Sequence, residues 1–200
     1  MSSEKQLSQI YIFSDKSEII DTVSYILMNI IDYSETIDDR TPSNFDNPSS
    51  LLDSNESYST SCSSIESRDS ENSDDTFLNK MDQYDLNTFI KKFSKNFQLD
   101  ENTLILSLMH IDKILSKDFV ITDKNVRYLF CTSMIVSQKF YEDEPIDNNI
   151  YAKYVGISAA ELTQLELEFL EMLDYNLFVS DEKFYNYKNR MASLYKNNLS

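Results

Sequence analysis

Glycine is almost absent from this chain, and its scarcity limits the possible folds more than any other feature. The 200 residues include one glycine and three prolines, whereas 41 % of them are apolar. Tight hairpins between β-strands and phosphate-binding loops both depend on glycine, because other residues rarely adopt positive φ angles. The composition therefore predicts an all-α protein with polar connections and enough apolar residues for one sizeable core.

The charge balance and the shortage of ligand residues exclude several kinds of partner. The 18 basic and 34 acidic residues give a net charge of −16, which opposes binding to nucleic acid and to anionic membranes. Two cysteines and one histidine are too few for a zinc site, and no nucleophile–base pair stands out. We expect no metal, no cofactor, no small-molecule substrate and no catalytic residue. The opening MSSEKQLSQI lacks a signal-peptide pattern, so we expect an intracellular protein, in the nucleus, the cytoplasm or both.

Composition divides the chain into three zones. Residues 1–37 contain one amphipathic helix, and residues 77–200 have dense helical patterning. Between them, residues 38–76 are rich in serine and acid and poor in large apolar groups, which predicts a disordered insertion. Acid-directed or proline-directed patterns mark possible phosphorylation sites there, with an unmodified solvating linker as the alternative. These candidate sites are Thr41, Ser43, Ser50 and Ser63.

Apolar residues that recur at intervals of three and four predict seven helices. The helices are expected over residues 17–33, 83–96, 102–115, 124–140, 148–155, 158–173 and 181–197. Asp123 is expected to cap the fourth helix, which is apolar or small on nearly all sides and so central and buried. Gly156 fits a left-handed C-cap, and Ser158 with Glu161 fits a capping box in which Glu161 faces solvent. We expect His110 and Cys131 to be core residues.

One carboxylate falls in an apolar stripe. Glu166 lies between Leu162 and Leu170 at helical spacing, where an unpaired charge would cost several kcal/mol. Lys139, at the end of the central helix, is the expected partner. Spacing leaves two interpretations open: a structural ion pair at the rim of the core, or a pair held at a surface groove to meet another protein.

Four segments in order resemble consecutive parts of a cyclin box. They are LILSLMHIDKIL, NVRYLFCTSMIVSQKF, NNIYAKYVGISAAEL and LELEFLEMLDYNLFVSDEKF. The resemblance is to the single-box, phosphate-response (P- and U-type) cyclins of fungi, plants and protists, and it covers residues 77–188. It implies a single five-helix cyclin box with one additional N-terminal helix and one C-terminal helix. The family's aspartate–arginine pair in the second helix is Asp112–Lys113 here.

The resemblance implies a non-catalytic regulatory subunit that binds and activates a cyclin-dependent protein kinase as a heterodimer. The family's charged kinase-binding pair maps onto Lys139 and Glu166. Neighbouring family contacts map onto Phe140, Leu170, Tyr175 and Leu177. The alternatives are a cyclin-fold adaptor in transcription and a helical scaffold that has lost its kinase contact.

Overall fold

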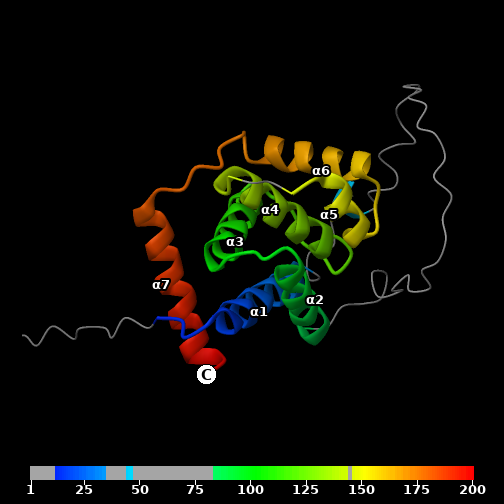
Figure 1. The fold of residues 1–200 in the computed structure, drawn as a ribbon. Coiled ribbons are helices and arrows are strands. Elements are labelled where there is room, and N and C mark those ends of the chain that lie inside the picture. The colour runs from blue at the N-terminus through cyan, green and yellow to red at the C-terminus, as the bar shows by residue number, and fades with distance from the viewer. Residues whose placement is uncertain (1–11, 35–43, 47–82, 144–145) are drawn as a thin grey trace, which may run out of the picture.

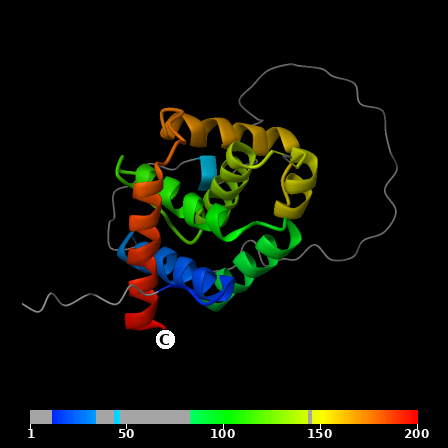
Figure 2. The ribbon, with the colours of Figure 1, turned by 60° about the vertical axis from the view of Figure 1, so that its left-hand side comes forward.

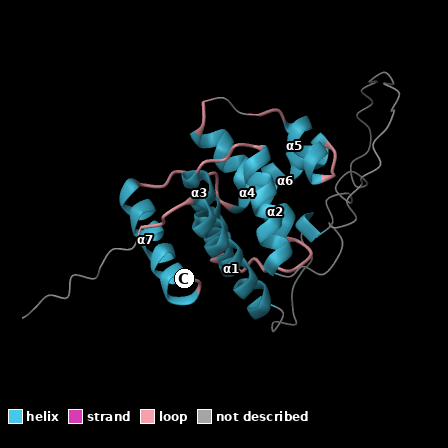
Figure 3. Ribbon diagram, turned by 60° about the horizontal axis from the view of Figure 1, so that its bottom comes forward, coloured by secondary structure: helices cyan, strands magenta, loops and turns pink. Residues whose placement is uncertain are grey.

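The computed structural model describes residues 12–34, 44–46, 83–143 and 146–200. Over these residues the chain forms α-helices and one short 3-10 helix, η1, and Figure 3 shows no strand among them. The elements are α1 (Lys16–Ser34), η1 (Asn44–Asp46), α2 (Gln83–Asn96), α3 (Glu101–Leu115), α4 (Val126–Tyr141), α5 (Asn148–Val155), α6 (Ala159–Met172) and α7 (Asp181–Asn198). The all-α prediction is confirmed.

The helices surround a central pair. Helices α3 and α4 pack together in the middle, α6 covers α4 on one side, and α1 covers α3 on the other (Figures 1 and 2). Helix α2 packs on α1, α5 packs on α6, and α7 runs along α1 and α3 at one end of the molecule. Helices α2 to α6 are the five helices expected of a single box, and α1 and α7 are the two additional helices.

Helix α4 is buried on nearly all sides, as its composition predicts. All residues from Val126 to Gln138 apart from Tyr128 are buried. Small hydroxyl side chains on α4 let α3 approach closely. They also satisfy backbone groups inside the core: the Ser133 hydroxyl donates to the Ser107 carbonyl over 2.7 Å. Cys131 lies among these residues, is 1 % exposed, and has its thiol pKa raised by burial, so it is an inert core residue.

His110 is a satisfied core histidine. It is fully buried on α3, with Nδ1 2.9 Å from the Ser137 hydroxyl and Nε2 2.9 Å from the Leu177 carbonyl. A carbonyl can only accept, so Nε2 carries the proton and Nδ1 accepts from Ser137. Burial lowers the pKa of His110, partly opposed by its hydrogen bond to Leu177. The ring therefore joins α3, α4 and the segment after α6 in its neutral form.

The signals at the ends of α5 and α6 form as predicted, with one exception. Gly156 has φ 81° and ends α5 in the left-handed conformation. The Ser158 hydroxyl accepts from the Glu161 backbone N–H over 3.1 Å, and the Glu161 carboxylate accepts from the Ser158 N–H over 2.6 Å. The prediction that Glu161 faces solvent is wrong, because this return bond draws its side chain in and leaves the residue 7 % exposed.

The predicted cap of the central helix is also wrong. Helix α4 begins at Val126, and its N-cap position is Asn125 rather than Asp123. Asn125 is buried, and its side chain holds the preceding turn by accepting from Thr122 N–H over 2.9 Å and donating to the Val120 carbonyl over 3.0 Å. An asparagine can do both because its amide carries a donor and an acceptor, whereas a carboxylate only accepts.

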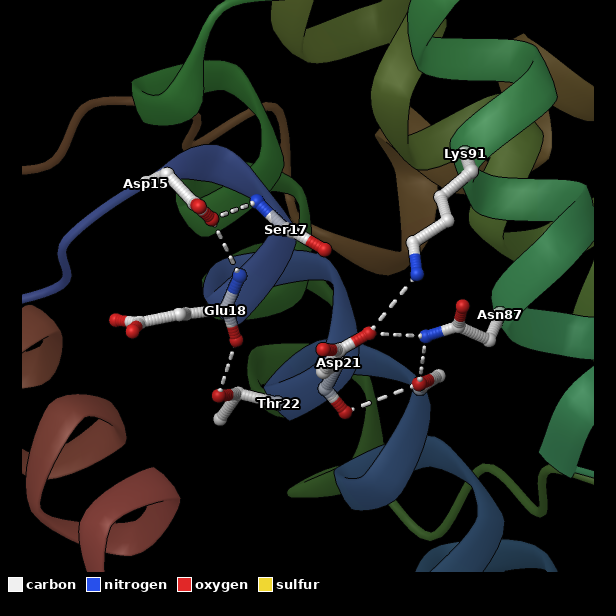
Figure 4. Close-up of polar contacts among 8 residues, drawn as sticks. Asp15, Ser17, Glu18, Asp21, Thr22, Asn87 and Lys91 are labelled. Carbon is white, nitrogen blue, oxygen red and sulfur yellow. Dashed lines mark hydrogen bonds and ion pairs between the residues drawn. The ribbon is translucent and has the colours of Figure 1, made fainter. Parts of the chain in front are cut away.

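Helix α1 is tied to the box by polar contacts shown in Figure 4. Asp15 accepts from the backbone N–H groups of Ser17 and Glu18, over 2.7 and 3.2 Å, and so caps the first turn. Further along α1, Asp21 accepts from Asn87 of α2 over 2.8 Å and pairs with Lys91 over 3.2 Å. These bonds, with the apolar stripe from Ile19 to Ile31, place α1 against the box.

The acidic segment has one point of attachment among the residues that the structure describes. Within 38–76, Asn44–Asp46 forms η1, and Phe45 is fully buried with its ring 6.1 Å from that of Phe119 in an edge-to-face contact. Phe45 therefore anchors Asn44–Asp46 to the core, while the rest of the predicted disordered insertion lies outside the described residues and stays a prediction. The four candidate phosphorylation sites lie outside the described residues and stay predictions.

Candidate functional site

A groove of about 430 Å³ lies where α4 ends beside α6. Its lining residues come from α4, α6 and the segment that follows α6. They are Val136, Lys139, Phe140, Thr163, Glu166, Leu167, Leu170 and Leu177. The fold thus brings together five of the six residues that the cyclin resemblance assigned to kinase binding, although they span almost forty positions of the chain.

Lys139 and Glu166, which both line this groove, form the predicted ion pair. The Lys139 ammonium lies 2.5 Å from Glu166 Oε1, and the two side chains are 29 % and 11 % exposed. Helix α4 carries Lys139 in its last turn, while Glu166 lies in the apolar stripe of α6 between Leu162 and Leu170. The pair is sheltered by apolar neighbours but reached by solvent on one side, so its charges stay available to a partner.

A third polar residue, Asn148, completes the pair and was not found from the sequence. Its side-chain amide donates to Glu166 Oε2 over 2.6 Å, and its carbonyl oxygen accepts a hydrogen bond from the Lys139 ammonium. The amide also donates to the Thr163 hydroxyl over 3.2 Å. Asn148 is the first residue of α5, just after the N-cap Asp147, and its position in a polar NN pair carries no periodic signal.

Exposed apolar side chains surround the charged pair. Phe140 is 50 % exposed and Leu167 is 42 % exposed, and both line the groove. Leu170 is half-buried, and Leu177 is buried and forms the floor. Leu177 is held there by its carbonyl, which accepts from the Tyr141 hydroxyl over 2.9 Å as well as from His110. Contiguous apolar surface of this kind on a protein is typical of an interaction site.

Tyr175 lies beside the groove rather than in its lining, on a strained turn. Asp174 and Tyr175 have φ angles of 51° and 56°, and non-glycine residues pay roughly 1 kcal/mol or more each for this left-handed conformation. Two backbone bonds hold the turn, from Asp174 N–H to Glu171 O over 2.9 Å and from Tyr175 N–H to Leu170 O over 2.8 Å. Lys117 adds an ion pair to Asp174. The turn leaves Tyr175 61 % exposed, pointing away from the core.

The chemistry of this arrangement is that of recognition. Its charges are engaged with each other and with a neutral amide, and the rest of the lining is apolar apart from the Thr163 hydroxyl. In the described part of the chain, no group of three or more histidine, cysteine or acidic side chains is arranged to hold a metal ion. Within those same residues, every helix is too short or too polar to span a lipid bilayer.

Comparison with known proteins agrees with the fold. A family model described as Cyclin matches residues 7–177. The chain is 31 % identical over 103 residues to Cyclin-P2-1 of Oryza sativa subsp. japonica. The aligned stretch covers 51 % of this chain and 48 % of that protein. It is 31 % identical over 117 residues to Cyclin-U4-3 of Arabidopsis thaliana, covering 56 % and 53 %.

A yeast protein shares a shorter but more similar stretch. The chain is 41 % identical over 71 residues to PHO85 cyclin-7 of Saccharomyces cerevisiae, covering 36 % of this chain and 25 % of that protein. The chain spans about half the length of the two plant relatives and a quarter of the yeast one. The match to the family model covers most of the chain, including α1 and all five helices of the box. The chain therefore belongs to the cyclin family and resembles its P- and U-type members.

Proposed function

We propose that this protein is a regulatory subunit that binds a cyclin-dependent serine/threonine kinase and activates it. The chain would contribute a docking surface and no catalytic group. The single observation that carries the proposal is the Lys139–Glu166 pair, set with Asn148 in an apolar groove on a cyclin box. Membership of the family supports a kinase as the partner, as does the name of the relative PHO85 cyclin-7.

The shape of the groove suits a partner that presents a helix and a neighbouring loop. Phe140, Leu167 and Leu170 offer an apolar area that a partner helix can cover, and Tyr175 extends this area beyond the groove. The Lys139–Glu166 pair within this apolar area favours a partner with matching polar groups. It disfavours a purely apolar partner, which would leave the two charges without polar contacts. Aromatic side chains such as Phe140 and Tyr175 are enriched in protein interfaces relative to the rest of the surface.

Activation then follows from preferential binding. A kinase is active when its own lysine–glutamate pair and its magnesium-binding aspartate are in place, and this depends on the position of its mobile C-helix. A surface that packs on the C-helix only in its active position shifts the population towards that state. A tenfold rise in the active fraction of a mostly inactive kinase requires tenfold tighter binding to the active state, about 1.4 kcal/mol.

Recovery of the partner from the source cells tests the proposal. Tagged wild-type chain is compared with Lys139→Glu and Glu166→Lys, and the bound proteins are identified and assayed for kinase activity. Glu171→Lys and Lys153→Glu are matched controls, because they make the same charge changes at exposed positions outside the groove. Circular dichroism checks that every variant keeps its helices.

We expect a proline-directed serine/threonine kinase with the wild type and both controls, and its loss with both reversals in the groove. Recovery of no kinase, or equal recovery with all variants, would contradict the proposal. Co-purification with transcription proteins instead of a kinase would favour the cyclin-fold adaptor. The location in the nucleus or the cytoplasm stays a prediction that the same tagged chain can address by microscopy.

A further inference from the structure

A second groove, of about 810 Å³, lies between α3 and α7, away from the groove between α4 and α6. In Figure 1, α7 forms one end of the molecule and α5 lies towards the other. One lining residue, Met109, comes from α3 and forms an apolar floor. The others come from α7 and are Lys183, Asn186, Asn189, Arg190 and Ser193.

The lining is cationic in a strongly acidic chain. The whole protein carries −16, yet the side chains that line this groove include two cations, two amides and one hydroxyl, and no carboxylate. Neither Lys183 nor Arg190 forms a salt bridge with a residue that the structure describes. All five polar side chains of the lining can donate hydrogen bonds, so the groove offers donors and positive charge to an anionic ligand.

Neighbouring residues add one cation, hold the guanidinium in place and set one acid beside it: burial raises the pKa of the Asp112 carboxyl, and the charge of Arg190 partly opposes this rise. Lys113 is one helical turn beyond Met109 on α3 and donates to the Asn176 carbonyl over 3.1 Å. Burial lowers the pKa of Lys113, and the nearby charge of Lys183 lowers it further. The Arg190 guanidinium lies over the Tyr187 ring, 5.4 Å from its centre, and the Tyr187 hydroxyl donates to Asp112 over 2.6 Å. Stacking of this kind restricts where the guanidinium can point.

The spacing of the cations limits the shape of the ligand. Lys183, Asn186, Arg190 and Ser193 recur at intervals of three and four, so they share one face of α7. Lys183 and Arg190 are seven residues apart, which is roughly 10 Å along a helix that rises about 1.5 Å per residue. A peptide in the polyproline II conformation rises about 3.1 Å per residue and presents every third side chain on the same face, so it covers this distance in about three residues. Two acidic side chains at positions i and i+3 of such a peptide therefore match the two cations.

We propose that the groove between α3 and α7 binds an acidic peptide segment of a partner protein, in the polyproline II conformation. Aspartate or glutamate at positions i and i+3 would pair with Lys183 and Arg190, and the amides of Asn186 and Asn189 would bind the peptide backbone. The support for an acidic ligand is the positive charge of the groove lining, which is complementary to aspartate and glutamate side chains. The site is independent of the kinase-binding proposal, since the two grooves share no lining residue.

Fluorescence anisotropy with the full-length chain tests the proposal. The probe is a fluorescein-labelled peptide of twelve glycine, serine and alanine residues that carries glutamates at positions i and i+3. One comparison peptide has glutamines at those positions, and another has the glutamates adjacent. The test variant is Lys183→Glu with Arg190→Glu. The control is Lys196→Glu, an exposed lysine of the same helix outside the lining, which reverses one charge where the test variant reverses two.

We expect saturable binding of the i, i+3 peptide by the wild type and Lys196→Glu, weakened at least tenfold in the double variant. The glutamine peptide and the adjacent-glutamate peptide should bind at least tenfold more weakly than the i, i+3 peptide. Equal affinity for wild type and double variant, or no saturable binding at about 0.15 M salt, would overturn the proposal.

The acidic segment of the chain itself is the competing occupant. A further full-length variant replaces the aspartates and glutamates of residues 53–75 with asparagine and glutamine. Peptide affinity unchanged within twofold supports a partner as the source of the ligand. Affinity that rises tenfold or more would assign the groove to the chain's own segment and overturn the proposal of a partner.

Discussion

Asn148 offers the sharpest test of how the charged groove is built. Its amide donates to Glu166 over 2.6 Å, and its carbonyl oxygen accepts from Lys139, so one neutral side chain bonds both members of the pair. A hydrogen bond to a charged group contributes about 1.5–3 kcal/mol when buried. Glu166 is 11 % exposed and Lys139 is 29 % exposed, so water replaces part of what a truncation removes.

We therefore expect Asn148→Ala to lower the free energy of unfolding by about 1.5 kcal/mol. For a chain of this length, that corresponds to a fall in Tm of roughly 3–6 °C. Urea titration followed by circular dichroism measures the change. Asn149→Ala is the matched control, because the side chain of Asn149 is exposed at the start of α5 and, among the residues that the structure describes, bonds only Asp147, over 2.7 Å. We expect the control to change stability by less than about 0.5 kcal/mol.

A second substitution of Asn148 predicts an order of stability between two variants. Asn148→Asp keeps the acceptor for Lys139 but removes the donor to Glu166 and places a second carboxylate beside it. The repulsion should make this variant less stable than Asn148→Ala. Equal stability of the Asn148→Ala and Asn149→Ala variants, or an aspartate variant as stable as the wild type, would refute the role assigned to Asn148.

Three further predictions concern the core and the ends of helices. Burial lowers the pKa of His110 in the folded chain. As pH falls, the histidine is therefore protonated in the unfolded chain near pH 6.5, before it is protonated in the folded chain. Stability should thus fall as pH drops below 6.5, and between pH 7.5 and 5.5 wild type should lose about 1 kcal/mol more than His110→Gln in urea titrations. Gly156→Ala should cost about 1 kcal/mol at φ 81°, although no atom of the described residues lies within 4 Å of the added Cβ; an unchanged Tm would contradict this. Phe45→Ala should cost about 3 kcal/mol by leaving a cavity beside Phe119, and a loss below about 1 kcal/mol would mean that Phe45 is not in the core.

Much of the fold could be predicted because its signals are local. Apolar periodicity located the ends of the helices to within two residues: both ends of α2 (Gln83–Asn96) agree with the expected range, and α7 (Asp181–Asn198) ends one residue later than expected. Gly156 was recognisable because left-handed C-caps favour glycine, and a capping box needs only two residues at fixed spacing. Glu166 was recognisable as unusual because a carboxylate in an apolar stripe requires a partner.

What the sequence could not provide depends on contacts between distant segments. Asn148 bonds Lys139 and Glu166, which lie nine residues before it and eighteen after it, and no periodicity marks such a residue. Phe45 is surrounded by serines and acids, so composition concealed an anchor that packs on Phe119. Asp123 is a good cap by propensity, but the buried Asn125 satisfies both a donor and an acceptor of the turn before α4.

The most direct test of the central claim is a titration of the recovered kinase with the purified chain, read as the rate of phosphorylation of a peptide substrate. Wild type, Glu166→Lys and the control Glu171→Lys are compared at equal concentrations. The account predicts that wild type and Glu171→Lys raise the rate at least tenfold, and that Glu166→Lys needs at least tenfold more protein for half-maximal activation. A kinase whose rate is unchanged by the wild-type chain, or one that Glu166→Lys activates as well as wild type does, would contradict it.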